Sequence, residues 1–233
     1  FTSQKPEYIE LPHPTPAKKH IPDWYKNIPR FLGEPSNFDV TFKKEVLNKN
    51  LTVKACTPIL DFFTSGYIIP LWQDLLVENP PDGEKSFYWP DNSITLLDEH
   101  PITQVKGSPL EKETSGGPIY KLNSPWRIQT PPGYSCFFFS PFYHRGDIEI
   151  LPAIVDTDGL GQVNFPFLYK GQGRENLYQA GSPLIQVLPF KRDDWTHAVE
   201  EGSDLENQKF KTKLFQSFSN AYKKRFHKKK VFL

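Results

Sequence analysis

The sequence has few of the residues that build disulfides and metal sites. Only two of its 233 residues are cysteines, Cys56 and Cys136, and they lie far apart in the chain. We therefore expect buried free thiols rather than a disulfide, which fits a reducing compartment. The chain has no CxxC or HExxH motif, and its six histidines do not cluster at ligand spacing. We predict no metal site and no cofactor.

Long apolar runs are also absent. No segment approaches the roughly 20 apolar residues that a membrane-spanning helix needs, and no basic region precedes an apolar one as in a signal peptide. We expect a soluble protein that does not interact with membranes and is not secreted by a signal peptide.

Proline is abundant instead. The chain contains 23 prolines, about twice the usual share, together with 37% hydrophobic and 15% aromatic residues. Proline disfavours long helices, whereas the apolar content of a chain this long is enough for a core. We predict a mainly β protein with an antiparallel β-sandwich or β-clip-like body at residues 51–200. A Pro-rich arm (1–50) would precede the body, and a basic amphipathic helix and tail (201–233) would follow it.

The N-terminal arm has seven prolines and little periodicity, which is typical of an extended segment. Its exception is an aromatic pair, Trp24 and Tyr25, which is costly to leave in water. We predict that this pair is a contact site, which docks either on the protein's own body or on a neighbouring subunit.

Turn residues divide the body into short elements. Thr57 is placed as the N-cap of a short helix that ends at Gly66. Strands are predicted at residues 67–77, 86–89, 94–97, 126–130 and 134–139, of which the last two would pair across Pro131-Pro132-Gly133.

A strand at residues 148–155 ends in the turn residues Asp156-Thr157-Asp158-Gly159 and is followed by strands at 162–169 and 183–190. We predict hairpins around residues 156–161 and 171–181 that join consecutive strands. The positions of Asp156, Asp158, Gly161, Gly181 and Gln186 resemble the third motif of the dUTPase superfamily and the Gly-x-x-x-x-Gln that follows it. The resemblance implies a β-clip fold and, for an active enzyme, Asp156 ordering the attacking water, Gln186 as a partner and a divalent metal with the triphosphate.

This resemblance covers about forty residues and departs from the family at important positions. Gly159 stands where the family has an aromatic residue that stacks on the sugar, and the phosphate-binding Pro-Arg-Ser-Gly motif is not contiguous. The Gly-rich C-terminal flap is absent as well. The alternative reading is that residues 156–159 form an ordinary turn, and we predict no catalytic residue.

A longer resemblance spans most of the chain. The order Asp-Trp-Tyr, TSGYIIPLW, SPWRIQTPPGYS, SPFYH, VDTDG and QVLPFKR is similar to an uncharacterised group of proteins from tailed phages and some bacteria. The resemblance implies a viral setting, either in the virion or in the host cytoplasm, and no particular activity.

The C-terminal segment differs from the body in its periodicity and charge. Ser203 and Glu206 have capping-box spacing, and apolar residues recur at every fourth position, namely Phe210, Leu214, Phe218, Tyr222 and Phe226. Residues 209–230 contain nine Lys or Arg, among them Lys223, Lys224 and Arg225, and no Asp or Glu. This pattern predicts one amphipathic basic helix.

The basic helix could contact an acidic protein surface, with its aromatic residues as anchors, or it could bind nucleic acid. We favour protein because the aromatic stripe needs burial. The leading interpretation is a non-enzymatic structural or assembly protein, a phage virion component whose two arms contact other subunits. The alternative is a dUTPase-like nucleotide-binding protein or pyrophosphatase.

Overall fold

The computed structural model describes residues 1–32, 51–81, 84–91, 93–114, 117–144, 146–215 and 221–233. These residues form two compact units. The first, here the β unit, comprises Phe1–His20 and Gly66–Arg192 and contains all the strands named below. The second, here the helical unit, comprises Ile21–Ser65 and Asp193–Leu233. Residues 1–20 thus belong with the sheets and residues 51–65 with the C-terminal helices, unlike the expected division at 50 and 200.

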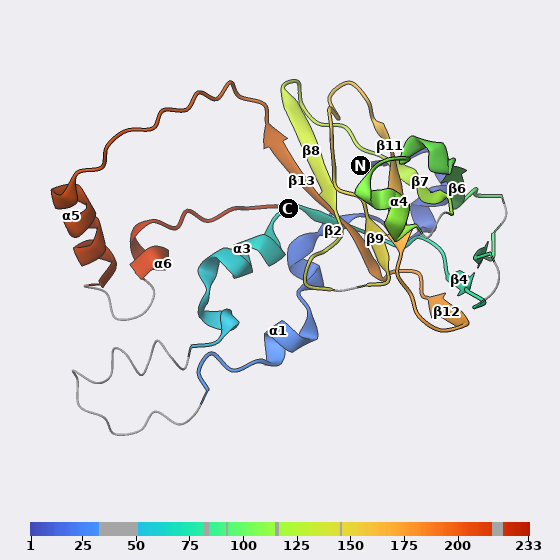
Figure 1. The fold of residues 1–233 in the computed structure, drawn as a ribbon, viewed down its shortest axis with the longest axis horizontal. Coiled ribbons are helices and arrows are strands. Elements are labelled where there is room, and N and C mark those ends of the chain that lie inside the picture. The colour runs from blue at the N-terminus through green and yellow to red at the C-terminus, as the bar shows by residue number, and fades with distance from the viewer. Residues whose placement is uncertain (33–50, 82–83, 92, 115–116, 145, 216–220) are drawn as a thin grey trace. The chain divides into compact units, whose positions relative to one another are not determined.

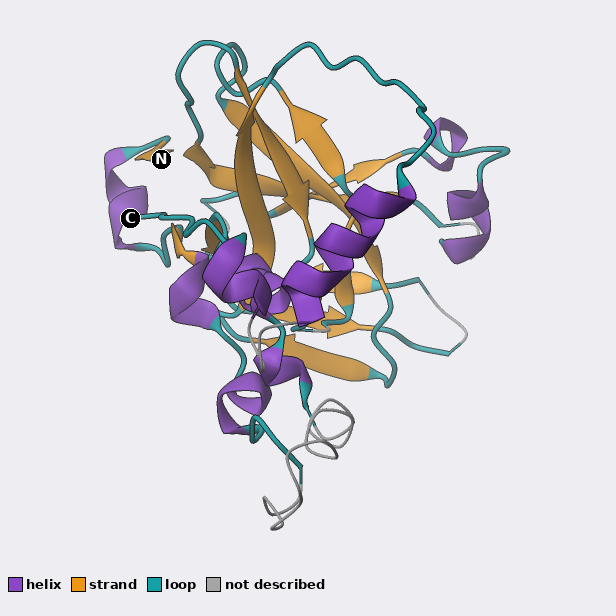
Figure 2. Cartoon of the chain, turned by 90° about the vertical axis from the view of Figure 1, so that its left-hand side faces the viewer, coloured by secondary structure: helices purple, strands orange, loops and turns teal. Residues whose placement is uncertain are grey.

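Two antiparallel five-stranded sheets form most of the β unit (Figures 1 and 2). The first has the order β1-β7-β11-β9, with β6 also paired to β7. Its strands are β1 (Thr2–Ser3), β6 (Leu97–His100), β7 (Ile119–Arg127), β9 (Ile148–Ile150) and β11 (Gln162–Tyr169). In β11, buried Val163, Phe165 and Phe167 alternate with more exposed residues, so that strand presents one face to the core.

The second sheet has the order β10-β8-β13-β3-β2. Its strands are β2 (Thr15–Pro16), β3 (Tyr67–Pro70), β8 (Tyr134–Phe139), β10 (Ala153–Val155) and β13 (Pro183–Lys191). Four successive residues of β13, from Leu184 to Val187, are buried, so both faces of this central strand are covered. A three-stranded sheet, β12-β4-β5, completes the unit with β4 (Leu75–Glu78), β5 (Ser86–Tyr88) and β12 (Glu175–Tyr178).

Aromatic contacts join the sheets into one core. The rings of Phe138 on β8 and Phe165 on β11 are 5.4 Å apart, which packs the two large sheets face to face. Phe87 on β5 lies 4.4 Å from Tyr120 on β7 and adds the small sheet. Each of these large side chains contributes on the order of 1.5–3 kcal/mol of burial free energy. The predicted mainly β, antiparallel, sandwich-like body is confirmed.

The strands do not pair as expected around residue 150. The predicted strand at residues 148–155 is two strands, β9 and β10, which lie in different sheets: β9 pairs with β11, whereas β10 pairs with β8. The break falls at Leu151-Pro152, where proline lacks a backbone N–H for the ladder. The turn at Asp156–Gly159 therefore connects two sheets, and the hairpin predicted there is wrong.

Two further predicted pairings are wrong because the strands concerned lie in different sheets. Strand β12 interrupts the hairpin predicted at residues 171–181, because it pairs with β4 of the small sheet. Strands β7 and β8, which flank Pro131-Pro132-Gly133, belong to different sheets. The strand expected at 67–77 is divided into β3 and β4, and β6 begins at Leu97, the last residue of the strand expected there.

The first 20 residues are not simply an extended arm. Besides β1 and β2 they form two 3-10 helices, η1 (Pro6–Glu10) and η2 (Ala17–His20). Tyr8 and Ala17 are buried, and the amide of Gln4 donates to the carbonyl of Pro125 at 2.9 Å. These residues therefore extend both large sheets. The β unit also contains η4 (Ile102–Gln104) and α4 (Pro109–Glu113).

The helical unit contains α1 (Asp23–Asn27), η3 (Val53–Ala55), α3 (Thr57–Thr64), α5 (Asp204–Phe215) and α6 (Ala221–Arg225). Helix α3 begins at Thr57, but its N-cap is Cys56, which makes no side-chain capping bond, so the predicted cap is wrong. None of the described helices is long and apolar enough to cross a bilayer.

The single helix predicted for residues 203–226 is also wrong. The rings of Phe210 and Phe226 are 5.9 Å apart, whereas sixteen residues of a straight helix would separate them by about 24 Å. Helices α5 and α6 are therefore distinct and pack against each other through these two rings. Residues 216–220, which lie between them, are outside the described part of the chain.

Candidate functional site

The turn after β10 orients the two carboxylates of the dUTPase-like motif. The amides of Gly159 and Leu160 both donate to the carbonyl of Asp156, at 3.1 and 2.9 Å. Thr157, which lies between the two aspartates, is fully buried. Its hydroxyl donates to Sγ of Cys136 at 3.3 Å and is 2.8 Å from Oγ1 of Thr130. Burial raises the pKa of the Cys136 thiol. The turn is thus anchored inward by Thr157, which places Asp156 and Asp158 to either side.

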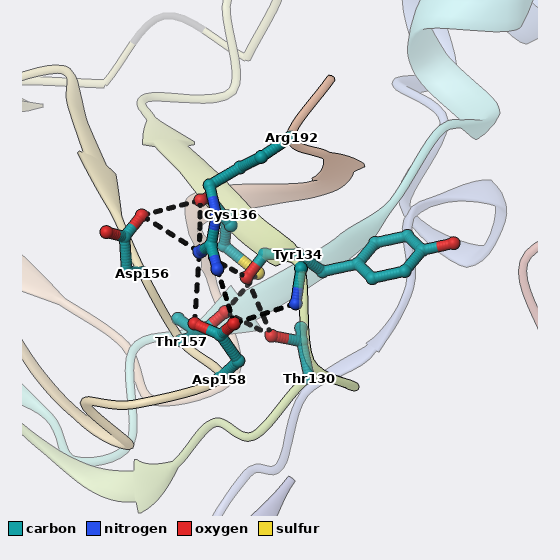
Figure 3. Close-up of polar contacts among 9 residues, drawn as sticks. Thr130, Tyr134, Cys136, Asp156, Thr157, Asp158 and Arg192 are labelled. Atoms are coloured by element: carbon teal, nitrogen blue, oxygen red, sulfur yellow. Dashed lines mark hydrogen bonds and ion pairs between the residues drawn. The ribbon is translucent and has the colours of Figure 1, made fainter. Parts of the chain in front are cut away.

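Arg192 is the main partner of both carboxylates (Figure 3). Its guanidinium donates to Oδ1 and Oδ2 of Asp158 at 3.0 and 2.5 Å, and lies 3.2 Å from Oδ1 of Asp156. The same group donates to the carbonyl of Tyr134 at 3.2 Å. Arg192 directly follows β13, so this fork joins the end of that strand to the turn and to the start of β8.

The two carboxylates differ in their surroundings. The side-chain hydrogen bonds from Arg192, followed by the amide of Gly133, lower the pKa of Asp158 to about 2. Its side chain is 16% exposed. Asp156 is 70% exposed and accepts a 2.6 Å hydrogen bond from the Ser135 hydroxyl. Asp158 therefore remains ionised at any physiological pH.

The structure does not bring Asp156 and Gln186 together. In the register of β10, β8 and β13, Val155 and Pro189 both lie opposite Cys136, whereas Gln186 lies opposite Phe139. Asp156 is thus four residues further along the sheet than Gln186, about 13 Å at the strand rise. Gln186 is 4% exposed in the centre of its sheet. The matching spacing in sequence does not produce a shared site in space.

Arg192 was not predicted from the sequence as a partner of the motif. The only sequence signal is the Lys191-Arg192 pair at the end of an apolar strand, and such a pair does not identify its acceptor. The resulting cluster of two carboxylates and one guanidinium is a charged link between turn and strands. Among the described residues, no group of three His, Cys, Asp or Glu side chains could hold a metal ion.

The aromatic pair of the N-terminal region lies in the helical unit. Tyr25 is only 4% exposed, and its ring lies 4.6 Å from that of Phe63 on α3. Trp24 is 6.0 Å from the same ring, yet it remains 42% exposed. Tyr25 thus anchors α1 to α3, whereas Trp24 keeps much of its surface available.

The predicted C-terminal contact residues are exposed where they are described. Phe210, Tyr222 and Phe226 are 52%, 40% and 41% exposed. Lys223, Lys224 and Arg225 lie exposed on α6. Leu214 belongs to α5, but its side chain, like the whole of Phe218, lies outside the described part of the structure.

Both cysteines are free, as predicted, but only Cys136 is buried, and Cys56 is exposed. A search of protein-family models found no match to this chain, and no curated protein matches its sequence.

Proposed function

We propose that this chain is a non-enzymatic structural or assembly protein that contacts other protein subunits through its helical unit. The observation that carries this proposal is the unequal burial of apolar side chains in the two units. Among the described residues of the helical unit, the buried apolar side chains are Tyr25 and Phe63, whereas the β unit has a large core.

The helical unit instead exposes many large apolar side chains. Its exposed members are Trp24, Phe31, Leu32, Leu60, Trp195, Val199, Leu205, Phe210, Tyr222, Phe226, Val231 and Leu233. Trp195 and Val199 are 87% and 96% exposed. Such a concentration of apolar surface is typical of an interaction site. Aromatic residues are also the common anchors of protein interfaces.

Charge supports a protein partner with an acidic surface. Residues 193–206 carry six Asp or Glu and no Lys or Arg, whereas residues 209–230 carry nine Lys or Arg and no Asp or Glu. The basic segment would steer towards an acidic receiver, and its aromatic residues would supply buried contacts. Nucleic acid remains the second candidate partner for the lysines. Binding to nucleic acid through the lysines would give no role to the exposed aromatic side chains Phe210, Tyr222 and Phe226.

The viral part of the proposal, that this is a phage virion component acting in the particle or in the host cytoplasm, rests on the resemblance of the sequence alone. The nucleotide-binding alternative is weakened by the distance between Asp156 and Gln186 and by the pairing of Asp156 with Arg192. We therefore retain the assembly role.

The experiment compares the full chain with a protein that lacks residues 205–233, by analytical ultracentrifugation over a range of concentrations. We expect the full chain to form larger species, alone or with a co-purifying protein, and the truncated chain to remain folded and monomeric. Truncated protein that assembles normally, or a full chain that stays monomeric and unaccompanied, would refute the proposal.

Point variants separate the two partner classes. Phe210→Ala with Tyr222→Ala should weaken assembly strongly, whereas Tyr88→Ala with Ile154→Ala removes two exposed apolar side chains of the β unit and serves as the matched control. Binding to nucleic acid would instead respond mainly to Lys223→Gln with Lys224→Gln. It would also fall steeply with salt.

A further inference from the structure

The β unit contains a pocket that takes no part in the charged cluster at Arg192. Its volume is about 540 Å³, within the range of small-molecule sites. Leu71, Ile148 and Leu184 supply apolar walls, and His144, Asp147, Glu149 and Tyr178 supply polar groups. The lining comes from the residue that follows β3, from the loop after β8, from β9, from β12 and from the start of β13, all within the β unit.

A chain of hydrogen bonds fixes the carboxylate of Asp147. The hydroxyl of Tyr178 donates to Oδ2 of Asp147 at 2.7 Å and lies 3.1 Å from the hydroxyl of Tyr169. The Asn176 amide donates to Tyr169 at 2.9 Å. Among the described residues, none donates to the second carboxylate oxygen of Asp147, Oδ1. The carboxylate of Asp147 is therefore oriented by Tyr178 through Oδ2, and its Oδ1 can accept a hydrogen bond from a ligand.

Among the described residues, the charges around the pocket are mainly negative. Lys170 pairs with both Glu149 and Glu113, so one ammonium is shared between two carboxylates, and Asp147 adds a third. Burial lowers the pKa of His144, although a hydrogen bond to the backbone of His20 acts in the opposite direction, so this imidazole does not add a positive charge at neutral pH. No lysine or arginine is among the described residues that line the pocket. These described carboxylates would disfavour an anion, whereas a cation would gain a charged partner in Asp147.

We propose that this pocket binds a primary ammonium group carried on a short aliphatic stem, with Asp147 as its charged acceptor. The ammonium has three donors and no acceptor, which matches carboxylate and hydroxyl groups. The aliphatic stem contacts Leu71, Ile148 and Leu184, which cannot satisfy a polar chain. Two sources share this chemistry, a free small amine and a lysine side chain of a protein. The proposal concerns the β unit alone and does not depend on the proposed assembly role.

The test follows backbone amide shifts of the full chain by nuclear magnetic resonance during titration with butylammonium, 1-butanol and butyrate. We expect butylammonium to shift the amides of residues 146–149 and 182–184 saturably, and the other two probes to have little effect. Equal shifts with butanol would show that the pocket binds the aliphatic stem without recognising the charge, which would overturn the proposal. Shifts with butyrate, or none with butylammonium, would overturn the proposal.

Variants assign the acceptor. Asp147→Asn keeps the shape and an acceptor for Tyr178 but removes the charge, and we expect affinity for butylammonium to fall roughly tenfold or more. Asp98→Asn makes the same chemical change at the ion pair with Lys121 on the β6–β7 ladder and should leave affinity unchanged. If Asp147→Asn is poorly folded, Tyr178→Phe is measured instead. This variant keeps the charge of Asp147 and should therefore retain affinity for butylammonium. Equal affinity in the wild type and Asp147→Asn would overturn the assignment.

Two more ligands distinguish the sources, a capped lysine and a peptide of residues 221–233. Tighter binding of the peptide, lost when its lysines are acetylated, indicates a lysine side chain as the occupant, and equal affinity for butylammonium and the peptide indicates a free amine. Arg145→Gln is included because this residue joins two lining residues and lies outside the described part of the chain. Retained amine binding in that variant supports the proposal, and its loss would contradict a cation site.

Discussion

Nε2 of His227 lies 2.9 Å from Oδ1 of Asp61, although the two residues are 166 positions apart in the sequence. The second oxygen, Oδ2, accepts a hydrogen bond from Nζ of Lys230 at 2.5 Å. Burial alone would raise the pKa of Asp61, but the hydrogen bonds from Lys230 and His227 lower it overall. One carboxylate on α3 thus holds two side chains that follow α6, those of His227 and Lys230, a link that the sequence pattern did not indicate.

We predict that Asp61→Asn releases the C-terminal tail. Loss of the ionised acceptor should speed tryptic cleavage after Lys228, Lys229 and Lys230 roughly fivefold, or about 1 kcal/mol, because cleavage follows the population of the open form. Timed digestion with mass spectrometry measures this rate. Asp98→Asn is the control with an exposed ion pair elsewhere, and unchanged cleavage in Asp61→Asn would contradict the prediction.

The link between Arg192 and Asp158 should make stability depend on pH in a defined window. The folded-state pKa of Asp158, about 2, is below its unfolded value of about 4. Its contribution is therefore present above pH 4 and disappears as the pH falls through 2. In urea unfolding, Asp158→Asn should be less stable than the wild type at pH 5–7, and the difference should close towards pH 2. A difference as large at pH 2 as at pH 5–7 would rule out this ion pair as its cause.

A pair of glycine substitutions separates backbone strain from steric overlap. Gly66 has φ of +74°, and a Cβ there would lie 2.0 Å from the carbonyl oxygen of Val187 on β13. Gly133 has φ of +84° but open space around it. Gly133→Ala should cost about 1 kcal/mol of unfolding free energy from the left-handed backbone alone, and Gly66→Ala more than about 2 kcal/mol. Chemical denaturation measures both. Equal costs would show that β13 moves aside without penalty.

We also predict that the purified protein releases no pyrophosphate from dUTP or dCTP with magnesium above a no-enzyme control. Gly159 replaces the aromatic residue that stacks on the sugar in the dUTPase superfamily, and Asp156 is paired with Ser135 and Arg192. A coupled phosphate assay measures release. Turnover that disappears in Asp156→Asn would instead establish the nucleotide-hydrolysing alternative.

Local patterns predicted several strands closely. Strands β8 and β11 have the predicted bounds, and β13 extends one residue further, to Lys191. Each is rich in β-forming residues and directly follows a glycine or a serine, so propensity and turn chemistry agree at its start. The prediction of one continuous amphipathic helix was wrong because a four-residue spacing alone does not reveal that α5 and α6 are separate helices.

Pairing and site geometry could not be predicted in the same way. A run of β-forming residues does not state its partner, and Pro152 gave the only local signal that β9 and β10 separate. The matches at Asp156 and Gln186 describe spacing along the chain, whereas their distance depends on the register of β10, β8 and β13. The partners of Arg192 and of Asp61 lie in segments that are distant in the sequence. Only the assembled fold specifies such contacts.

The path of the chain through β9, β10 and β11 has a consequence for how this protein folds. These three consecutive strands lie in the first sheet, the second sheet and the first sheet again. The chain therefore crosses between the two large sheets twice over these strands, and their pairings, β9 with β11 and β10 with β8, join residues that are not neighbours in the sequence. Chains dominated by such non-local pairings cross their folding barrier slowly, in milliseconds to seconds. A chain that pairs its strands slowly exposes unpaired strand edges in the meantime, and such edges are prone to aggregate.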